Sequence, residues 1–347
     1  MVLLVLAIAA AMLSGCAAGP VDPDRPFAGQ TLRVFNWSDY IDPALIDEFE
    51  RRTGAHVQYD NYSTESELET KLLTGGVGYD VVFPSDHGMI LLTRKDMLLP
   101  LDKSKLPNLA NLDPLLLDPP YDPGNRFSVP YFWGTLAVGV RTDKIQEPVE
   151  GFAVLFDERY KGRITMLDDA ENVVAGVMLH LGHPLNSTDA AHLREVKQAL
   201  ALQKPLVQSY TSDAYKEKLI KGEAWAVLGW SGDILQAARE NPHVKAIVPS
   251  SGTMVWTDNM VIPQGARNVA LAHAFINFLL EAEIAAGNAN HVRYASPNAA
   301  ARPFLSAELL ENPAVYPPPE VLEKCDRLRD RGAEIVKIEK IWREVRQ

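Results

Sequence analysis

The chain has 347 residues, a net charge of −11 and only two cysteines. Its acidic balance and lack of a Lys/Arg cluster argue against nucleic-acid binding, and two cysteines make no disulfide framework. Such a length exceeds one ordinary hydrophobic core, so two domains are expected.

The first residues carry a targeting signal. Residues 2–13 are almost wholly apolar, too short to span a bilayer but typical of the core of a signal peptide. The sequence Leu-Ser-Gly-Cys that ends at Cys16 resembles a bacterial lipobox, in which the cysteine is lipidated. We therefore predict a lipoprotein signal peptide at 1–16 and a tether at 17–28. The protein would be periplasmic or at the cell surface, with the lipid as its only membrane attachment.

The first predicted strand ends in a loop of aromatic and acidic residues. A helix follows it, since Asp42 is a good N-cap, Pro43 suits the first turn and Gly54 ends the pattern. Residues 37–40 therefore lie in a strand-to-helix loop. In open α/β sheets, this carboxyl edge is where ligands bind.

The chemistry of this loop favours an organic cation. Trp37 and Tyr40 offer ring faces for cation–π attraction, and Asp39 between them offers a charge-assisted hydrogen bond. The alternative is that both rings only pack over the edge of the sheet.

Strand and helix patterns alternate through the first half of the chain. Strands are predicted at 55–59 and 81–83, and helices at 65–73 and 89–98. This alternation is typical of a parallel sheet covered by helices. The long extended segment 127–140 is predicted to cross into a second domain.

A second α/β unit follows. Strands are expected at 163–167, 224–228 and 244–248, and helices at 171–181, 190–202, from about 212, and 270–283. The extended segment 253–262 should return to the first domain. The predicted domains are 29–135 plus 256–300, and 136–255 plus 301–347.

Nearly every predicted strand end carries an aromatic ring, a short hydroxyl or an acid. These residues are Trp37, Ser38, Asp39, Tyr40, Ser85, Asp86, His87, Asp168, Asp169, Glu171, Trp230, Ser231, Asp233, Trp256 and Asp258. If the two sheets face each other, their carboxyl edges converge on one volume. Such an aromatic box with several carboxylates suits a flexible aliphatic polyamine. Asp42, Asp168 and Asp233 are alternatively helix caps.

Enzyme signatures are scarce. The sequence Gly-Trp-Ser-Gly at 229–232 misses the spacing of a nucleophile elbow by one residue. His180 and His183 are three residues apart with no acidic ligand between them. We predict no catalysis, no metal and no cofactor.

Taken together, the motifs resemble the periplasmic spermidine/putrescine-binding proteins of polyamine ABC importers. The resemblance runs from Thr31 to about Arg343. Its landmarks are Asn-Trp-Ser-Asp-Tyr-Ile (36–41), Tyr-Asp-Val-Val-Phe-Pro-Ser (79–85), Val-Pro-Tyr-Phe-Trp-Gly (129–134), Gly-Trp-Ser-Gly-Asp (229–233) and Tyr-Ala-Ser-Pro-Asn (294–298). The resemblance implies an α/β, two-domain, type II-like periplasmic-binding fold whose ligand cleft lies between the domains. It also implies an ABC permease in the inner membrane as partner, and we expect a monomer.

The resemblance also implies a set of ligand contacts. The positions that match the family pattern are Trp37, Ser38, Tyr40, Ser85, Ser212, Trp230, Asp233, Trp256, Asp258 and Tyr294. Three places depart from it. Asn172 stands where the family usually has a glutamate, with Glu171 one residue earlier, and His87 stands where some members have a tyrosine. A polar contact that some members have near the C-terminus falls at Asp326, Arg327 or Leu328, with no firm match to one of them.

We therefore expect capture of a polyamine such as putrescine or spermidine. Trp37 and Trp256 would sandwich its alkyl chain. Each ammonium would meet its own acids, Asp258 and Asp233 at one end, and Asp169 or Glu171 with Asp39 at the other, while Asp86 is a possible substitute for the acid lost at Asn172. The cleft would close on hinges near 133–139, 252–260 and 296–303.

Two other functions stay open. One is binding of another small amine or an amino-acid-like solute, although a carboxylate ligand would need an arginine and none stands out at the strand ends. The other is a ligand-sensing lipoprotein with no role in transport.

Overall fold

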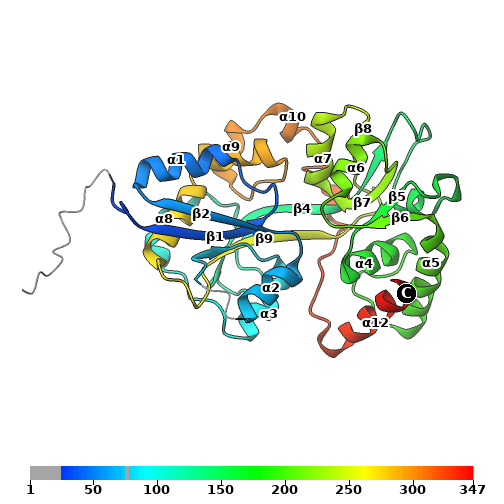
Figure 1. Ribbon diagram of the computed structural model, residues 1–347, viewed down its shortest axis with the longest axis horizontal. Coiled ribbons are helices and arrows are strands. Elements are labelled where there is room, and N and C mark those ends of the chain that lie inside the picture. The colour runs from blue at the N-terminus through cyan, green and yellow to red at the C-terminus, as the bar shows by residue number, and fades with distance from the viewer. Residues whose placement is uncertain (1–24, 75–77, 347) are drawn as a thin grey trace, which may run out of the picture.

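The computed structural model describes residues 25–74 and 78–346. The predicted signal peptide, Cys16 and most of the predicted tether lie outside these ranges. The described chain forms two α/β lobes joined by long strands, with the C-terminus on the second lobe (Figure 1).

The first lobe is built on parallel strands. β1 (Thr31–Trp37) lies between β2 (His56–Tyr62) and β3 (Val81–Val82). Its helices are α1 (Pro43–Thr53), α2 (Glu65–Leu73), α3 (Asp86–Arg94), α8 (Val269–Leu279), α9 (Ala282–Val292) and α10 (Ala307–Leu310). The predicted start of α1 is confirmed, because Asp42 accepts a hydrogen bond from the Ala44 amide.

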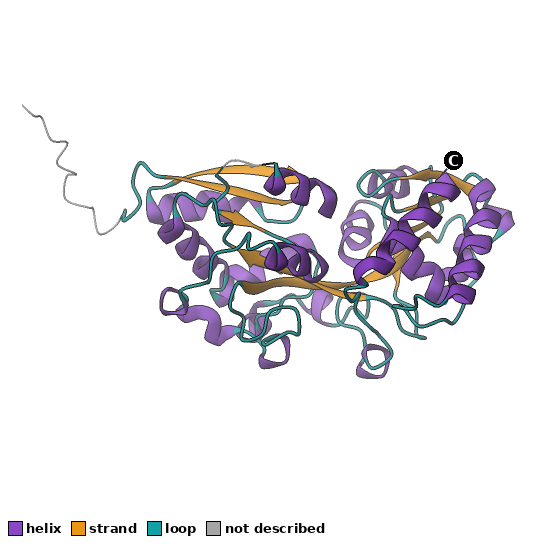
Figure 2. Ribbon diagram, turned by 90° about the horizontal axis from the view of Figure 1, so that it is seen from below, coloured by secondary structure: helices purple, strands orange, loops and turns teal. Residues whose placement is uncertain are grey.

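Two long strands connect the lobes. Residues 128–135 of β4 (Ser128–Arg141) pair antiparallel with β9 (Val255–Val261), and residues 136–140 pair with β7 (Ala226–Trp230) of the second lobe. The change of partner falls between Thr135 and Leu136. Figure 2 shows the strands running from one lobe into the other with helices flanking them.

The second lobe repeats the α/β plan. β5 (Ile164–Met166) is parallel to both β6 (Val207–Tyr210) and β7, while β8 (Val244–Ile247) pairs with the end of β4. The helices of this lobe are α4 (Ala170–His180), α5 (Ala190–Gln203), α6 (Tyr215–Lys221), α7 (Ser231–Glu240) and α12 (Ile335–Arg346).

The chain after α9 departs from the predicted layout. Residues 299–310 stay with the first lobe, where Asn290 on α9 bonds the Phe304 carbonyl and the Ser306 amide, although we assigned 301–347 to the second domain. The segment then continues through α11 (Pro319–Leu322). Residues 323–334, here called the C-terminal strap, pass between the lobes and lead into α12, so the third connection lies later than the predicted hinge at 296–303.

Local signals explain other differences. α3 begins at Asp86 rather than 89, because the Ser85 hydroxyl caps the Gly88 amide. The predicted helix 270–283 ends at Leu279, and α9 begins three residues later. Within the described ranges, no single helix has the length and apolarity of a membrane span, and only the pair α8 and α9, bent by 76°, passes that test jointly.

Candidate functional site

A cavity of about 410 Å³ lies between the lobes. Every predicted contact residue except Asp39 lines it: Trp37, Ser38, Tyr40, Ser85, Asp86, His87, Asp169, Glu171, Asn172, Ser212, Trp230, Asp233, Trp256, Asp258 and Tyr294. This volume is in the range of sites for small organic ligands.

Strand direction explains why these residues meet. The parallel strands of each lobe end at the junction, since β1 stops at Trp37 and the Trp230 end of β7 pairs with Leu136 at the crossing. β9 runs antiparallel to β3 and β4, so the beginning of β9, Trp256 and Asp258, lies at the same edge. Loops at the carboxyl ends of both sheets therefore face one volume.

Asp258 is a deeply buried acid of the cavity, at 6% exposure. Its Oδ2 accepts a hydrogen bond of 2.7 Å from the hydroxyl of Tyr40. Burial raises the pKa of Asp258 well above its ordinary value, and the charges of Glu65, Asp86 and Asp233 raise it further. Within the described chain, Asp258 has no salt bridge, so a bound cation is what would stabilise its charge.

Asp233 is held in a similar way. The hydroxyls of Tyr215 and Tyr294 each donate to its carboxylate at 2.7 Å. Burial raises the pKa of both tyrosines well above the ordinary value, so these hydroxyls stay protonated as donors. Asp233 is therefore a hydrogen-bonded acid that lines the cavity from within α7. It is not the N-cap of that helix, because the N-cap is Trp230.

Aromatic rings line the same end of the cavity. Trp230, Trp256, Tyr294 and Tyr40 form an edge-to-face series, with ring centroids 5.8, 5.2 and 5.3 Å apart. The close packing needs glycine, since a Cβ at Gly134 would lie 2.6 Å from the Trp256 ring. The rings offer faces for alkyl chains and cations.

The acid Glu171 is different, because the chain supplies its counter-ions. Its Oε1 lies 2.9 Å from His87 Nε2, and its Oε2 lies 2.8 Å from the guanidinium of Arg331. Burial opposes ionisation here, but these two partners outweigh it and lower the pKa of Glu171. Arg331 lies on the C-terminal strap.

Asp86 also has a chain counter-ion. Arg327, from the same strap, donates to Asp86 at 2.8 Å and to the Thr257 hydroxyl at 2.9 Å. We expected no arginine at the strand ends, and the resemblance pointed to Arg327 only as one of three adjacent positions for a polar contact. Arg331 was missed because it comes from an irregular segment near the C-terminus, which has no strand end and no periodicity to mark it.

Several cavity residues serve the local structure as well. Asp169 caps α4 by accepting from the Asn172 amide at 2.8 Å, so the cap of this helix is Asp169 and not its neighbour Asp168. Ser85 caps α3. Asn172 and Ser212 line the cavity directly.

Asp39 lies outside the cavity, contrary to its predicted role beside the second ammonium. Its backbone has φ 54°, and its side chain, 71% exposed, pairs with Lys216 of α6 at 2.7 Å. The left-handed turn directs the loop so that Trp37, Ser38 and Tyr40 line the cavity and Asp39 does not.

The end of β2 contributes residues that we did not predict. Tyr62, Ser63, Thr64 and Glu65 line the cavity, and they repeat the strand-end pattern of aromatic, hydroxyl and acid. Glu65 Oε2 accepts from the Ser85 amide at 3.2 Å, while its buried Oε1 has no hydrogen-bond partner in the described part of the chain. Burial raises the pKa of Glu65 to about 7.

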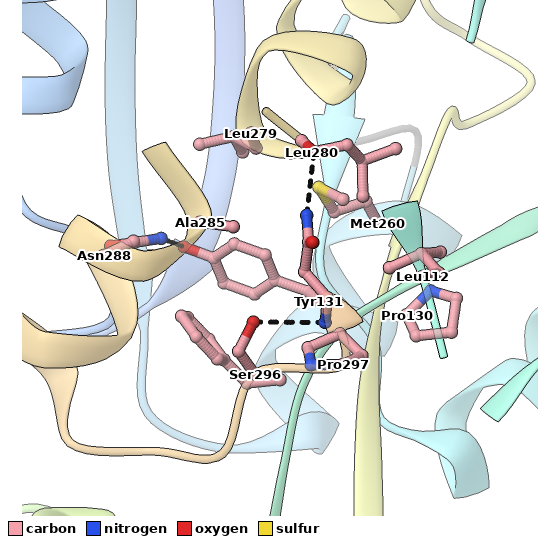
Figure 3. Close-up of a pocket in the computed structure, with 12 residues that line it drawn as sticks. Leu112, Pro130, Tyr131, Met260, Leu279, Leu280, Ala285, Asn288, Ser296 and Pro297 are labelled. Carbon is pink, nitrogen blue, oxygen red and sulfur yellow. Dashed lines mark hydrogen bonds between the residues drawn. The ribbon is translucent and has the colours of Figure 1, made fainter. Parts of the chain in front are cut away.

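A second, much smaller cavity lies within the first lobe (Figure 3). Its volume is about 10 Å³, room for about one water molecule. The Tyr131 hydroxyl, which accepts from Asn288 at 2.7 Å, points toward α9 there. Of these two cavities, the inter-lobe cavity is therefore the one with room for an organic ligand.

Comparisons with known proteins agree with this geometry. Residues 44–317 match the family described as bacterial extracellular solute-binding protein. The chain is 35% identical to the putrescine-binding periplasmic protein PotF of Escherichia coli, with 91% of each chain covered. It is 33% identical to a putrescine/cadaverine-binding protein of Pseudomonas aeruginosa, with 98% of each covered.

Solved structures show the same fold. The spermidine/putrescine ABC transporter substrate-binding protein PotD of Streptococcus pneumoniae superposes with a TM-score of 0.81 at 34% identity, covering 91% of this chain and 98% of that one. The TpPotD lipoprotein of Treponema pallidum gives 0.80 at 28% identity, covering 91% and 99%. The predicted α/β, two-domain periplasmic-binding fold is thereby confirmed. The chain belongs to the bacterial extracellular solute-binding proteins of transporters, among the spermidine/putrescine-binding periplasmic proteins, and its family implies a periplasmic or extracellular location.

Proposed function

We propose that this protein captures a small aliphatic amine, putrescine or spermidine, and delivers it to an ABC permease. The observation that carries the proposal is Asp258, a buried carboxylate that accepts a hydrogen bond from a tyrosine hydroxyl but has no counter-ion in the described structure. A buried charge without a counter-ion is unfavourable, so an ammonium at this point would be bound strongly. The names of the relatives agree with this ligand class.

In this proposal, the aromatic end of the cleft binds one ammonium. Asp258 and Asp233 take the charge, and Trp256 and Trp37 cover the methylene chain. Closure on β4, β9 and the C-terminal strap then encloses the amine, because these three segments connect the lobes.

A second candidate is a solute with one ammonium and a carboxylate. Arg327 at the edge of the cleft favours it, since an arginine was the missing element of that hypothesis. Its guanidinium is already bonded to Asp86 and Thr257, which makes it less available than a free arginine.

We further propose that the protein acts as a monomer attached by lipid at Cys16, and that it takes part in transport without catalysis. The lipobox-like sequence supports the anchor, and one solved relative is named a lipoprotein. Release from membranes after Cys16→Ser would test the anchor.

The direct test of ligand class is calorimetry on the chain from Ala17, refolded to remove any bound solute. Putrescine, spermidine, 4-aminobutanoate and 1,4-butanediol would be titrated separately. Tight binding of an amine with no heat from the diol supports the proposal. Binding of 4-aminobutanoate alone would favour the amino-acid-like solute. The absence of binding heat with all four compounds would overturn the proposal that the ligand is an amine.

A further inference from the structure

His87 and Glu171 face each other across the cleft. His87 lies in the first turn of α3 in the first lobe, and Glu171 lies in the first turn of α4 in the second. Arg331 is bonded to Oε2 and His87 to Oε1, so one carboxylate oxygen has a cationic partner at all times and the other has one whenever His87 is protonated. A ligand ammonium that approaches Glu171 must therefore displace one of these partners.

The two partners differ in how firmly they are held. Arg331 is only 2% exposed in its side chain and also donates to the Leu185 carbonyl at 3.0 Å. His87 is 31% exposed, and its Nδ1 has no hydrogen-bond partner within residues 25–74 and 78–346. Of the two, His87 is the one that a ligand can exchange.

We propose that protonated His87 takes the place of a ligand ammonium at Glu171, and that it thereby reduces the advantage in affinity that a diamine such as putrescine has over an amine with one charged end. The inference rests on the proposed function and deepens it, because it names the residue that sets how strongly the second charge of the ligand counts. A diamine must break the His87–Glu171 bond to bring its second ammonium to that acid, whereas a monoamine leaves the bond intact.

The groups around His87 make its charge sensitive to pH. Glu65 and Glu69 face it from α2, Asp86 from α3, and Asp169 and Glu171 from α4. The cations Arg327 and Arg331 come from the strap and are bonded to Asp86 and Glu171. Burial lowers the pKa of His87, but Glu171 and the other acids outweigh it, so the net direction is upward. Raising the pH through this pKa removes the competing charge on His87, so the affinity for a diamine should increase.

The test uses two amines with the same carbon chain, 1,4-diaminobutane and n-butylamine. Their dissociation constants would be measured by calorimetry for the wild type and for His87→Gln, at several pH values from about 6 to 8.5. Glutamine keeps a donor for Glu171 without a charge. The ratio of diamine to monoamine affinity should rise about tenfold in His87→Gln at the lowest pH, as expected for loss of one competing charge. The ratio should rise with pH more steeply in the wild type than in the variant, because the ionisation of the cavity acid Glu65, with a pKa of about 7, is common to both proteins and the loss of the His87 charge is not.

His183→Gln is the matched control, because His183 makes a comparable 2.9 Å pair with Glu195 away from the cavity. An unchanged ratio in His87→Gln would overturn the role of His87 while leaving amine binding standing. An equal rise in His183→Gln would also overturn it. If the wild type binds no amine, the proposed function itself is wrong and this inference with it.

Discussion

The two ends of the cleft use acids in opposite ways. At the aromatic end, Asp258 and Asp233 are bonded to tyrosine hydroxyls, which leave their negative charge unbalanced. At the other end, Glu171 is bonded to His87 and Arg331, which balance it fully. The first arrangement calls for a cation from solution, and the second ties parts of the chain together.

The pKa values express the same difference. Burial raises the pKa of Asp258 well above its ordinary value, whereas the cations beside Glu171 outweigh burial and lower its pKa. A count of the carboxylates that line the cleft therefore overstates the charge offered to a ligand. Replacing one carboxylate by an amide at each end should separate the two roles.

The largest expected effect is that of Glu171→Gln, which should lower the free energy of unfolding. Arg331 would stay buried without its counter-ion, and loss of one partner of a buried pair costs about 3 to 5 kcal/mol. Urea unfolding would measure this loss. Amine affinity of the folded variant should change less than it does in Asp258→Asn. A fully stable Glu171→Gln protein that no longer binds amines would reverse our assignment of the two ends.

Asp258→Asn should act on binding instead. Removing the charge that faces the ammonium should weaken amine binding by about 2 to 4 kcal/mol, measured by calorimetry. The ligand-free protein should become more stable, because the buried Asp258 charge no longer needs compensation. Asp47→Asn, an exposed acid of α1, is the control. Unchanged affinity in Asp258→Asn would mean that the ammonium site lies elsewhere.

Glu65→Gln should change how stability depends on pH. The pKa of Glu65 is about 7 in the folded protein against 4.5 ordinarily, so the folded state keeps a proton that the unfolded chain loses. Its contribution is full below about pH 4.5 and is lost as the pH rises to about 7. The variant should therefore match the wild type near pH 4 and exceed it by up to about 3 kcal/mol near pH 8.

Denaturant titrations at the two pH values test this. If the wild type were the more stable protein at the higher pH, Glu65 would be stabilised as an anion, as Glu171 is. It would then belong with the acids whose charge is compensated by cations of the chain. Added amine should raise wild-type stability more at the higher pH, where Glu65 is ionised.

The aromatic end of the cleft was predictable from sequence, but the end where the chain supplies counter-ions to Glu171 and Asp86 was not. Trp37 and Trp230 each mark the carboxyl end of a parallel strand, and Trp256 lies near the start of the antiparallel strand β9, so strand direction alone brings all three to one edge. Arg327 and Arg331 reach the cleft from the C-terminal strap, whose path depends on contacts with both lobes. No local pattern encodes such contacts, so the partners of Asp86 and Glu171 needed the structure.

Even where a loop was correctly predicted to belong to the site, packing determined which of its residues line the cavity. The loop after β1 was predicted as part of the site, but Asp39 leaves the cavity because its own φ is positive and Lys216 of the opposite lobe draws its carboxylate outward. At the end of β2, Glu65 follows the same sequence pattern as the other strand ends and was overlooked.

The smallest expected effect comes from Asp39→Asn. Its pair with Lys216 joins the lobes outside the cavity, and exposed ion pairs contribute less than about 1 kcal/mol. Amine affinity should therefore fall by less than about fivefold. The small loss should shrink further in high salt, because salt screens an exposed pair but leaves a buried one such as Asp258 with an ammonium nearly unchanged. Calorimetry at two salt concentrations gives both numbers. A salt-independent loss as large as that of Asp258→Asn would return Asp39 to the ligand site and break the distinction between acids inside and outside the cavity.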